Sequence, residues 1–122
     1  PITAIILTDD KSDFLLTDEA NDDFELINDV IDTWITNNAV KGVARIESST
    51  DNRLEMMVKI PVRDENDRPY STKKFAKDLR IAILKICKAA SASMGDGEMP
   101  DARSMQENID RGTIMLTMPS FK

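Results

Sequence analysis

The residues that could support acid–base or metal chemistry in this sequence are carboxylates. They gather in two short clusters, Asp9, Asp10 and Asp13 near the start and Asp64, Glu65 and Asp67 in the middle. Such oxygen-rich clusters can hold a divalent cation, but neither has the glycine and the ligand spacing of a calcium loop. Solvated turns are the more economical interpretation. No pair of carboxylates is singled out for catalysis, so we expect neither a metal site nor an enzyme.

The composition also disfavours nucleophilic catalysis. The chain has no histidine and a single cysteine, Cys87. Without histidine, Ser-His-Asp and Cys-His systems and most zinc sites are excluded. Cys87 follows Ile83 and Ile86 on an apolar helical stripe, so we interpret it as a small buried side chain rather than a reactive thiol. The sequence has no glycine-rich phosphate loop, and we expect no cofactor.

The best-defined element is a hairpin over residues 40–62. The turn is Thr50-Asp51-Asn52, and the preceding strand, residues 40–49, places Val40, Ala44 and Ile46 on one face. Residues 53–62 form the second strand, in which alternate side chains are apolar: Leu54, Met56, Val58, Ile60 and Val62. We therefore expect a sheet with an apolar side that helices cover and a charged side.

The charged side of this hairpin could bind nucleic acid. It carries four basic side chains that could contact phosphates over a wide surface: Lys41, Arg45, Arg53 and Lys59. Glu47 and Glu55 interrupt them, so a cross-strand ladder of ion pairs is the alternative. The residues alone favour neither interpretation.

Before the hairpin, the sequence predicts a second hairpin and a helix. Residues 3–7 and 14–16 are β-rich and flank a polar turn, which indicates an N-terminal hairpin. Residues 20–36 are predicted to form a helix, because Phe24, Ile27, Ile31 and Trp34 recur at helical spacing.

After the hairpin, Ser71 or Thr72 can cap a helix over residues 72–93, although alternation in residues 79–86 also fits a strand. A loop at residues 95–97, a short helix capped by Asp101 and holding Met105 and Ile109, and a strand at residues 113–118 complete the chain. The prediction is one α+β domain, residues 1–122, with an antiparallel or mixed sheet.

Charge is segregated along the chain, which has a net charge of −6. Residues 1–38 carry ten acidic groups and one lysine, whereas residues 73–88 carry six basic groups and one aspartate. These blocks could pair within or between subunits. The basic helix could also contact nucleic acid, but a solvated face is favoured. Of the seven methionines, five are interpreted as filling an irregular core or subunit interface: Met56, Met99, Met105, Met115 and Met118.

The sequence also bears on targeting. It has no run of about 18 apolar residues, so we expect no membrane-spanning helix. The start, Pro-Ile-Thr-Ala-Ile-Ile-Leu, lacks the basic region and cleavage site of a secretion signal. We expect an intracellular protein from which an initiator methionine has been removed.

Residues 4–62 resemble the coat proteins of small single-stranded RNA bacteriophages of the levivirus type. The resemblance lies in five stretches: Ile5-Ile6-Leu7-Thr8-Asp9-Asp10, Trp34-Ile35-Thr36-Asn37-Asn38, the strand with Val43, Arg45 and Glu47-Ser48-Ser49, Asp51-Asn52-Arg53, and Val58-Lys59-Ile60-Pro61. The chain departs from the family after the hairpin, because a helix follows soon after Pro69 and a strand closes the sequence.

This resemblance implies an antiparallel sheet, an interlocked homodimer with helices on one face of the sheet, and an icosahedral shell around genomic RNA. It places the protein in the virion, and in the bacterial cytoplasm during assembly. The charged face would line the shell interior, and by position its RNA-binding residues would be Lys41, Arg45, Glu47, Ser49, Arg53, Glu55, Met57 and Lys59.

Two functions therefore stand as hypotheses. The first is a coat subunit, which predicts a very large particle containing nucleic acid. The second is a small acidic interaction protein, such as a phage-encoded inhibitor or polymerase accessory factor, that acts through residues 9–32. It predicts a small oligomer that loses its partner on charge reversal at Asp22, Asp23 and Glu25.

Overall fold

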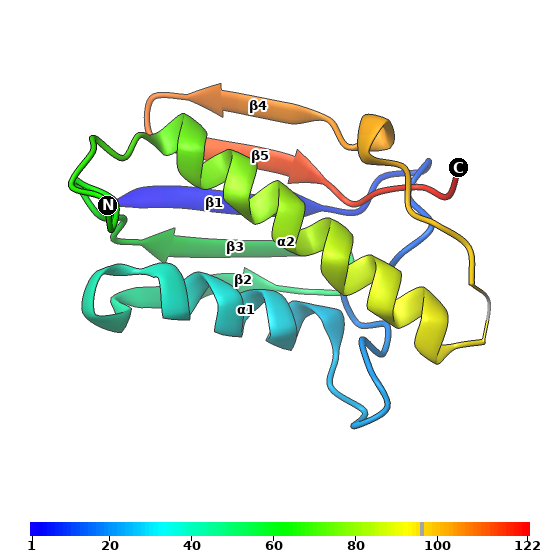
Figure 1. The fold of residues 1–122 in the computed structure, drawn as a ribbon. Coiled ribbons are helices and arrows are strands. Elements are labelled where there is room, and N and C mark those ends of the chain that lie inside the picture. The colour runs from blue at the N-terminus through cyan, green and yellow to red at the C-terminus, as the bar shows by residue number, and fades with distance from the viewer. Residues whose placement is uncertain (96) are drawn as a thin grey trace.

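The computed structural model describes residues 1–95 and 97–122, which form five strands and two α-helices (Figure 1). Asp96, in the loop predicted at residues 95–97, lies outside the described residues. The elements are, in chain order, β1 (Ile2–Leu7), α1 (Ile27–Asn38), β2 (Ala44–Ser49), β3 (Arg53–Val58), α2 (Thr72–Ser93), β4 (Glu107–Asp110) and β5 (Thr113–Thr117). The α+β class is confirmed.

The five strands form one mixed sheet in the order β2-β3-β1-β5-β4. β1 is antiparallel to β3 and parallel to β5, while the β2–β3 and β4–β5 pairs are antiparallel. Of the two sheet types that the sequence left open, antiparallel and mixed, the structure contains the mixed one, so the fully antiparallel sheet that the resemblance implies is not present. The predicted N-terminal hairpin was wrong, because β3 and β5 occupy both edges of β1. Phe14 and Leu16 are buried, but as part of a loop.

Both helices lie on the same side of the sheet (Figure 1). α2 begins where its cap predicts, because the Ser71 side chain accepts a hydrogen bond from the Lys74 backbone N–H at 3.1 Å. Leu79 and Ile83 are buried at helical spacing, whereas Ile81 between them is exposed. The alternative of a strand over residues 79–86 is thus wrong. Ser93 ends the helix, as predicted.

α1 begins at Ile27 instead of residue 20. The residues before α1 form a loop that backbone contacts hold together. The Ala20 backbone N–H donates to the Glu25 carbonyl at 2.7 Å, and Glu19 forms an antiparallel bridge with Leu26. Ile27 and Ile31 are buried as their spacing predicts. Phe24 belongs to the loop instead, so the apolar stripe begins one turn later than expected.

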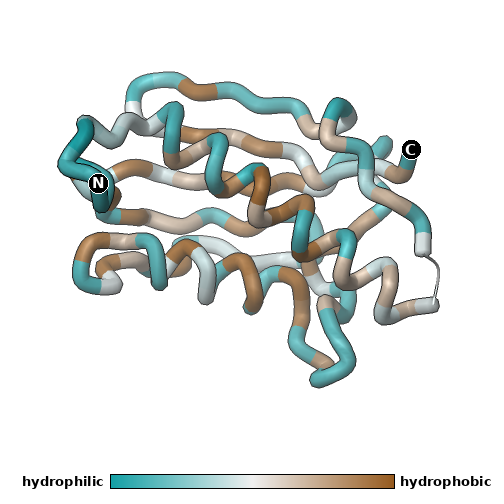
Figure 2. Tube along the Cα trace, viewed as in Figure 1, coloured by the Kyte–Doolittle hydropathy of each residue, from teal (hydrophilic) through white to brown (hydrophobic). Residues whose placement is uncertain are grey.

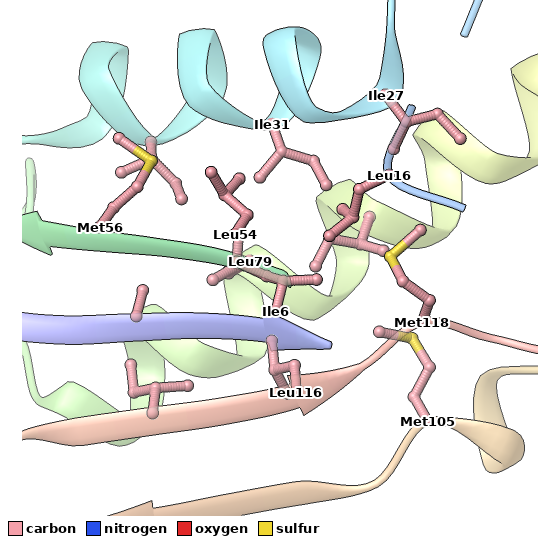
Figure 3. Close-up of a cluster of buried hydrophobic side chains, with 14 of the residues drawn as sticks. Ile6, Leu16, Ile27, Ile31, Leu54, Met56, Leu79, Met105, Leu116 and Met118 are labelled. Carbon is pink, nitrogen blue, oxygen red and sulfur yellow. The ribbon is translucent and has the colours of Figure 1, made fainter. Parts of the chain in front are cut away.

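The core fills the space between the helices and the sheet. Figure 3 shows Ile31 of α1 and Leu79 of α2 meeting strand residues such as Ile6, Leu54 and Leu116. In Figure 2 the strands and helices carry brown apolar positions, whereas the loop before α1 is mostly teal. Cys87 lies within this core, fully buried. The prediction of a buried cysteine is confirmed.

The central hairpin is confirmed, with shorter strands than predicted. Its turn pairs β2 with β3, and the apolar side chains of β3 face the helices, where they are buried: Leu54, Met56 and Val58. Val40 lies in a 3₁₀ turn, Val40–Gly42, before β2. Val62 lies beyond β3 and is 82% exposed, so the alternation does not continue to the predicted end.

The C-terminal segment is part helix and part hairpin. The Asp101 carboxylate accepts a hydrogen bond from the Arg103 backbone N–H at 3.1 Å, but the turn that it caps is only Ala102–Ser104. Ile109 lies on β4 rather than on a helix. β5 is confirmed as the final strand of the described chain, and it lies beside β1 near the middle of the sheet.

Candidate functional site

Within the part of the chain that the structure describes, no helix lies over the side of the sheet opposite α1 and α2 (Figure 1). Strand register decides which side chains lie there, because directly paired residues share a face. We name this surface the open face. Its members are Thr3, Ile5, Leu7, Arg45, Ser48, Arg53, Glu55, Met57, Asn108, Asp110, Thr113, Met115 and Thr117.

The middle of the open face is apolar. Ile5 on β1 pairs with Glu55 on one side and Met115 on the other, and its side chain is only 8% exposed. Leu7 is half-buried on the same strand. The Thr3 hydroxyl lies 3.5 Å from the Met57 sulfur. An apolar strip therefore runs along β1 between polar neighbours.

The charged part of the open face is electrically balanced. Arg45 Nε lies 2.7 Å from Glu47 Oε1, and Arg53 Nη2 lies 2.6 Å from Glu55 Oε1. Each pair joins two residues of the same strand, so the cross-strand ladder considered from the sequence does not form. The arginines are partly neutralised where phosphates would have to bind.

The open face gathers four of the residues predicted to bind RNA: Arg45, Arg53, Glu55 and Met57. Lys59 continues this side beyond β3, and its backbone N–H donates to the Val43 carbonyl at 2.9 Å.

Two predicted RNA-binding residues lie elsewhere. The Ser49 hydroxyl accepts a hydrogen bond from Asn28 Nδ2 of α1 at 3.2 Å, so Ser49 faces the helices. A register shift between Ile46 and Ser48 causes this, because one extra residue reverses the sides of those that follow. Lys41 lies in the 3₁₀ turn, with φ of 52°, and not on the strand. Sequence alternation cannot reveal either irregularity.

A groove of about 600 Å³ lies at one end of the open face. Arg45, Met57 and Lys59 line it, together with Val43. Val43, for which the sequence predicted no binding role, is an exposed apolar side chain. The groove therefore offers an apolar floor with two cations, of which Arg45 already pairs with a carboxylate.

The two acidic clusters form hydrogen-bonded turns. Asp9 Oδ1 accepts from the backbone N–H groups of Lys11 and Ser12, at 3.0 Å each. Burial opposes ionisation of Asp9, but these bonds and one from the Ser12 hydroxyl hold its pKa below the usual value. Asp64 accepts from the Asn66 and Arg68 backbones at 2.9 Å each. Its lowered pKa comes first from the Lys74 hydrogen bond.

The oppositely charged blocks do not form ion pairs with each other within the described part of the chain. One polar contact links the acidic N-terminal region to α2, in which the Ser93 hydroxyl donates to Asp22 Oδ1 at 2.7 Å. Pairing within one subunit, one of the two options open from the sequence, is therefore not what the structure contains.

Residues 2–99 match the family described as Domain of unknown function (DUF6175). The chain belongs to this family. The matched span runs from β1 through α2, while β4 and β5 of this DUF6175 chain follow it. No curated protein and no solved structure matches the chain significantly. In residues 1–95 and 97–122, no helix has both the length and the apolar character needed to cross a bilayer.

Proposed function

We propose that this protein is a structural, non-catalytic subunit that pairs with a second copy through the open face of its sheet. The observation that carries the proposal is the composition of this face. It has an apolar strip with Ile5, Leu7 and Met115, and beside the strip lie two arginine–glutamate ion pairs. Covering the strip removes the exposed parts of Leu7 and Met115 from water, which favours association. A neutral rim avoids repulsion between the copies.

A two-fold axis suits this pattern of charges. In a two-fold interface the same patch is used by both subunits and must complement itself. Because Arg53 and Glu55 are neighbours, a rotated copy can bring the arginine of each chain near the glutamate of the other. Two sheets can then stack about 10 Å apart. Since α1 and α2 already pack on their own sheet, this dimer needs no interlocked helices, unlike the dimer that the resemblance implies.

The coat-type function is the second candidate, and it gives the open face a different ligand. In it, dimers assemble into a shell in the virion, and the face binds single-stranded RNA. The groove lined by Arg45 and Lys59 favours this candidate, because Lys59 forms no ion pair within the described residues. The neutral charge of the remaining face favours a protein surface over a polyanion.

Light scattering after size-exclusion chromatography of the full chain tests the first candidate. At about 10 µM we expect a dimer for the parent protein and monomers for Leu7→Lys and Met115→Lys, which place a charge in the apolar strip. Val62→Lys is the matched control, because Val62 is exposed and outside the sheet, and it should stay dimeric. Circular dichroism verifies that the variants fold.

Two results would overturn this proposal. One is a parent protein that stays monomeric up to about 1 mM, a concentration at which even weak contacts are populated. The other is a dimer whose mass the two strip variants leave unchanged. A particle of very large mass with nucleic-acid absorbance would instead support the coat-type candidate.

A further inference from the structure

Phe24 is the one aromatic side chain in the described chain that projects into solvent, with 76% of its surface exposed. Its backbone has φ of 64°, in the left-handed region that a bulky side chain adopts only under strain. The ring gains almost no packing within its own chain in return for this strain. Residues 9–32, predicted as an acidic interaction surface, thus contain a strained and exposed aromatic group.

Hydrogen bonds hold the tip that carries Phe24, which we name the Phe24 loop (residues 21–25). The Phe24 backbone N–H donates to the Asn21 carbonyl at 3.3 Å, and Asn21 Oδ1 accepts from the Asp23 backbone at 3.0 Å. Asp22 ties the tip to the end of α2 through Ser93, at 2.7 Å. Hydrogen bonds thus fix the tip both within the loop and against the end of α2. A fixed tip presents the Phe24 ring in one position, which lowers the entropic cost of docking.

The loop also defines the chemistry of its partner. Three carboxylates flank the ring, Asp22, Asp23 and Glu25. A complementary site needs an apolar pocket for the ring and cations around it for the carboxylates.

A groove of about 350 Å³ between α1 and α2 has this chemistry. Trp34 and Val30 line it from α1, and Ile81, which is 43% exposed, lines it from α2. Along α2, Ile81 lies four residues from Lys77 and from Lys85, and seven from Lys88, positions that share a helix side. These three lysines form no ion pair within the described residues.

The acidic residue of this groove already has a partner. Asp78 Oδ2 accepts a hydrogen bond from the Tyr70 hydroxyl at 2.9 Å. Burial, and then this hydrogen bond, raise the pKa of Tyr70, so the hydroxyl stays a donor at neutral pH. Asp78 keeps its negative charge, but the three lysines outnumber this one carboxylate along the α2 side of the groove.

We propose that the Phe24 loop of one chain docks into the α1–α2 groove of a second copy. The Phe24 ring lies against Trp34 and Ile81, and the carboxylates of the loop meet Lys77, Lys85 and Lys88. The occupant is a second copy because the Phe24 loop and the groove match in both apolar and charged parts, and because the oppositely charged blocks form no ion pair with each other within the described residues. This contact uses the helix layer, so it is independent of the open face.

The test uses the full chain carrying Met115→Lys, which removes the proposed open-face contact and leaves this one. Sedimentation equilibrium from about 10 µM to about 1 mM should reveal association. Phe24→Gly should weaken it at least about tenfold while leaving the melting temperature unchanged or higher, because glycine adopts positive φ without strain. Leu15→Gly is the matched control, since Leu15 is an exposed apolar residue outside the loop, and it should associate normally.

Two further measurements locate the contact. Trp34 is the only tryptophan of the chain, so its fluorescence should change with protein concentration in the parent and stay constant in Phe24→Gly. Asp23→Lys/Glu25→Lys and Lys85→Glu/Lys88→Glu should each associate poorly alone and pair when mixed. A Met115→Lys protein that stays monomeric up to about 1 mM, equal association with Phe24→Gly, or mixed charge variants that fail to pair would each overturn the proposal.

Discussion

Arg53 and Glu55 alternate with the buried residues of β3 and join their side chains on the open face, 2.6 Å apart. The sequence presents Arg53 as a candidate phosphate ligand. The structure places a carboxylate on the same guanidinium, so a phosphate must compete with it. The same ion pair contributes to the neutral charge of the open face. Removing the charge of Glu55 should therefore change how the protein binds polyanions.

Glu55→Gln should raise the affinity of the protein for polyanions. It leaves Arg53 with a neutral neighbour, so the cation becomes available to phosphate. We expect elution from heparin at higher salt than the parent, with folding stability changed by less than about 1 kcal/mol because the pair is partly solvated. Glu65→Gln makes the same charge change in an exposed loop. Equal shifts in the two variants would contradict a role for the Arg53 site.

Leu54→Ala should destabilise the fold strongly. Leu54 is fully buried between β3 and the helices, and shortening such a side chain costs about 2–5 kcal/mol of unfolding free energy. Urea denaturation followed by circular dichroism measures the loss. Leu15→Ala removes the same atoms from an exposed side chain and should cost far less. Similar losses would mean that Leu54 is not a core residue.

Ser71→Ala should cost about 1 kcal/mol of unfolding free energy, because it removes the side-chain acceptor for the Lys74 backbone N–H at the start of α2. Ser71→Asn keeps an acceptor at this position and should retain most of the stability. Thermal or urea unfolding of the three proteins checks both expectations. Equal stability of the alanine and asparagine variants would argue against this cap.

Cys87 should resist alkylation in the folded protein and react completely once it unfolds. Burial, with a smaller effect of the Asp18 charge, raises the pKa of its thiol from 9.0 to about 12. The folded state therefore favours the protonated thiol, so this contribution to stability is complete below the unfolded pKa of about 9 and is lost as pH rises toward 12. Maleimide labelling with and without denaturant measures the exposure.

The Cys87→Ala variant is the control for the pH dependence of the unfolding free energy. Unfolding free energies at about pH 8 and about pH 10 should differ more for the parent than for Cys87→Ala, because only the parent must ionise this thiol on unfolding. Identical pH dependence in the two proteins would contradict the raised pKa.

Local patterns were sufficient for several elements of the fold. The alternation of Leu54, Met56 and Val58 located β3 and its buried side, and the hydroxyl of Ser71 located the start of α2. The final strand also followed from alternation. These features depend on side chains a few residues apart, and their physical cause is the geometry of a single strand or helix turn.

The open face was predicted only in part, because alternation reveals neighbours within one hairpin but not between strands that are distant in the sequence. Alternation identified Arg45, Arg53, Glu55 and Met57 as neighbours on one side of the hairpin. It missed the apolar strip of β1 and β5, because the sequence does not reveal that these distant strands lie side by side. It also misplaced Ser49, since a one-residue bulge changes side without changing composition.

By itself, then, the sequence determined the hairpin, the long helix, the buried cysteine and the segregation of charge, all of which follow from nearby residues. Only the tertiary structure decided that β1 lies between β3 and β5, that Phe24 projects from a loop instead of packing in α1, and that an arginine pairs with a glutamate within β2 and again within β3. The physical reason is that strand partners, bulges and ion pairs are chosen by the free energy of the whole packed chain, in which distant residues compete for the same partners.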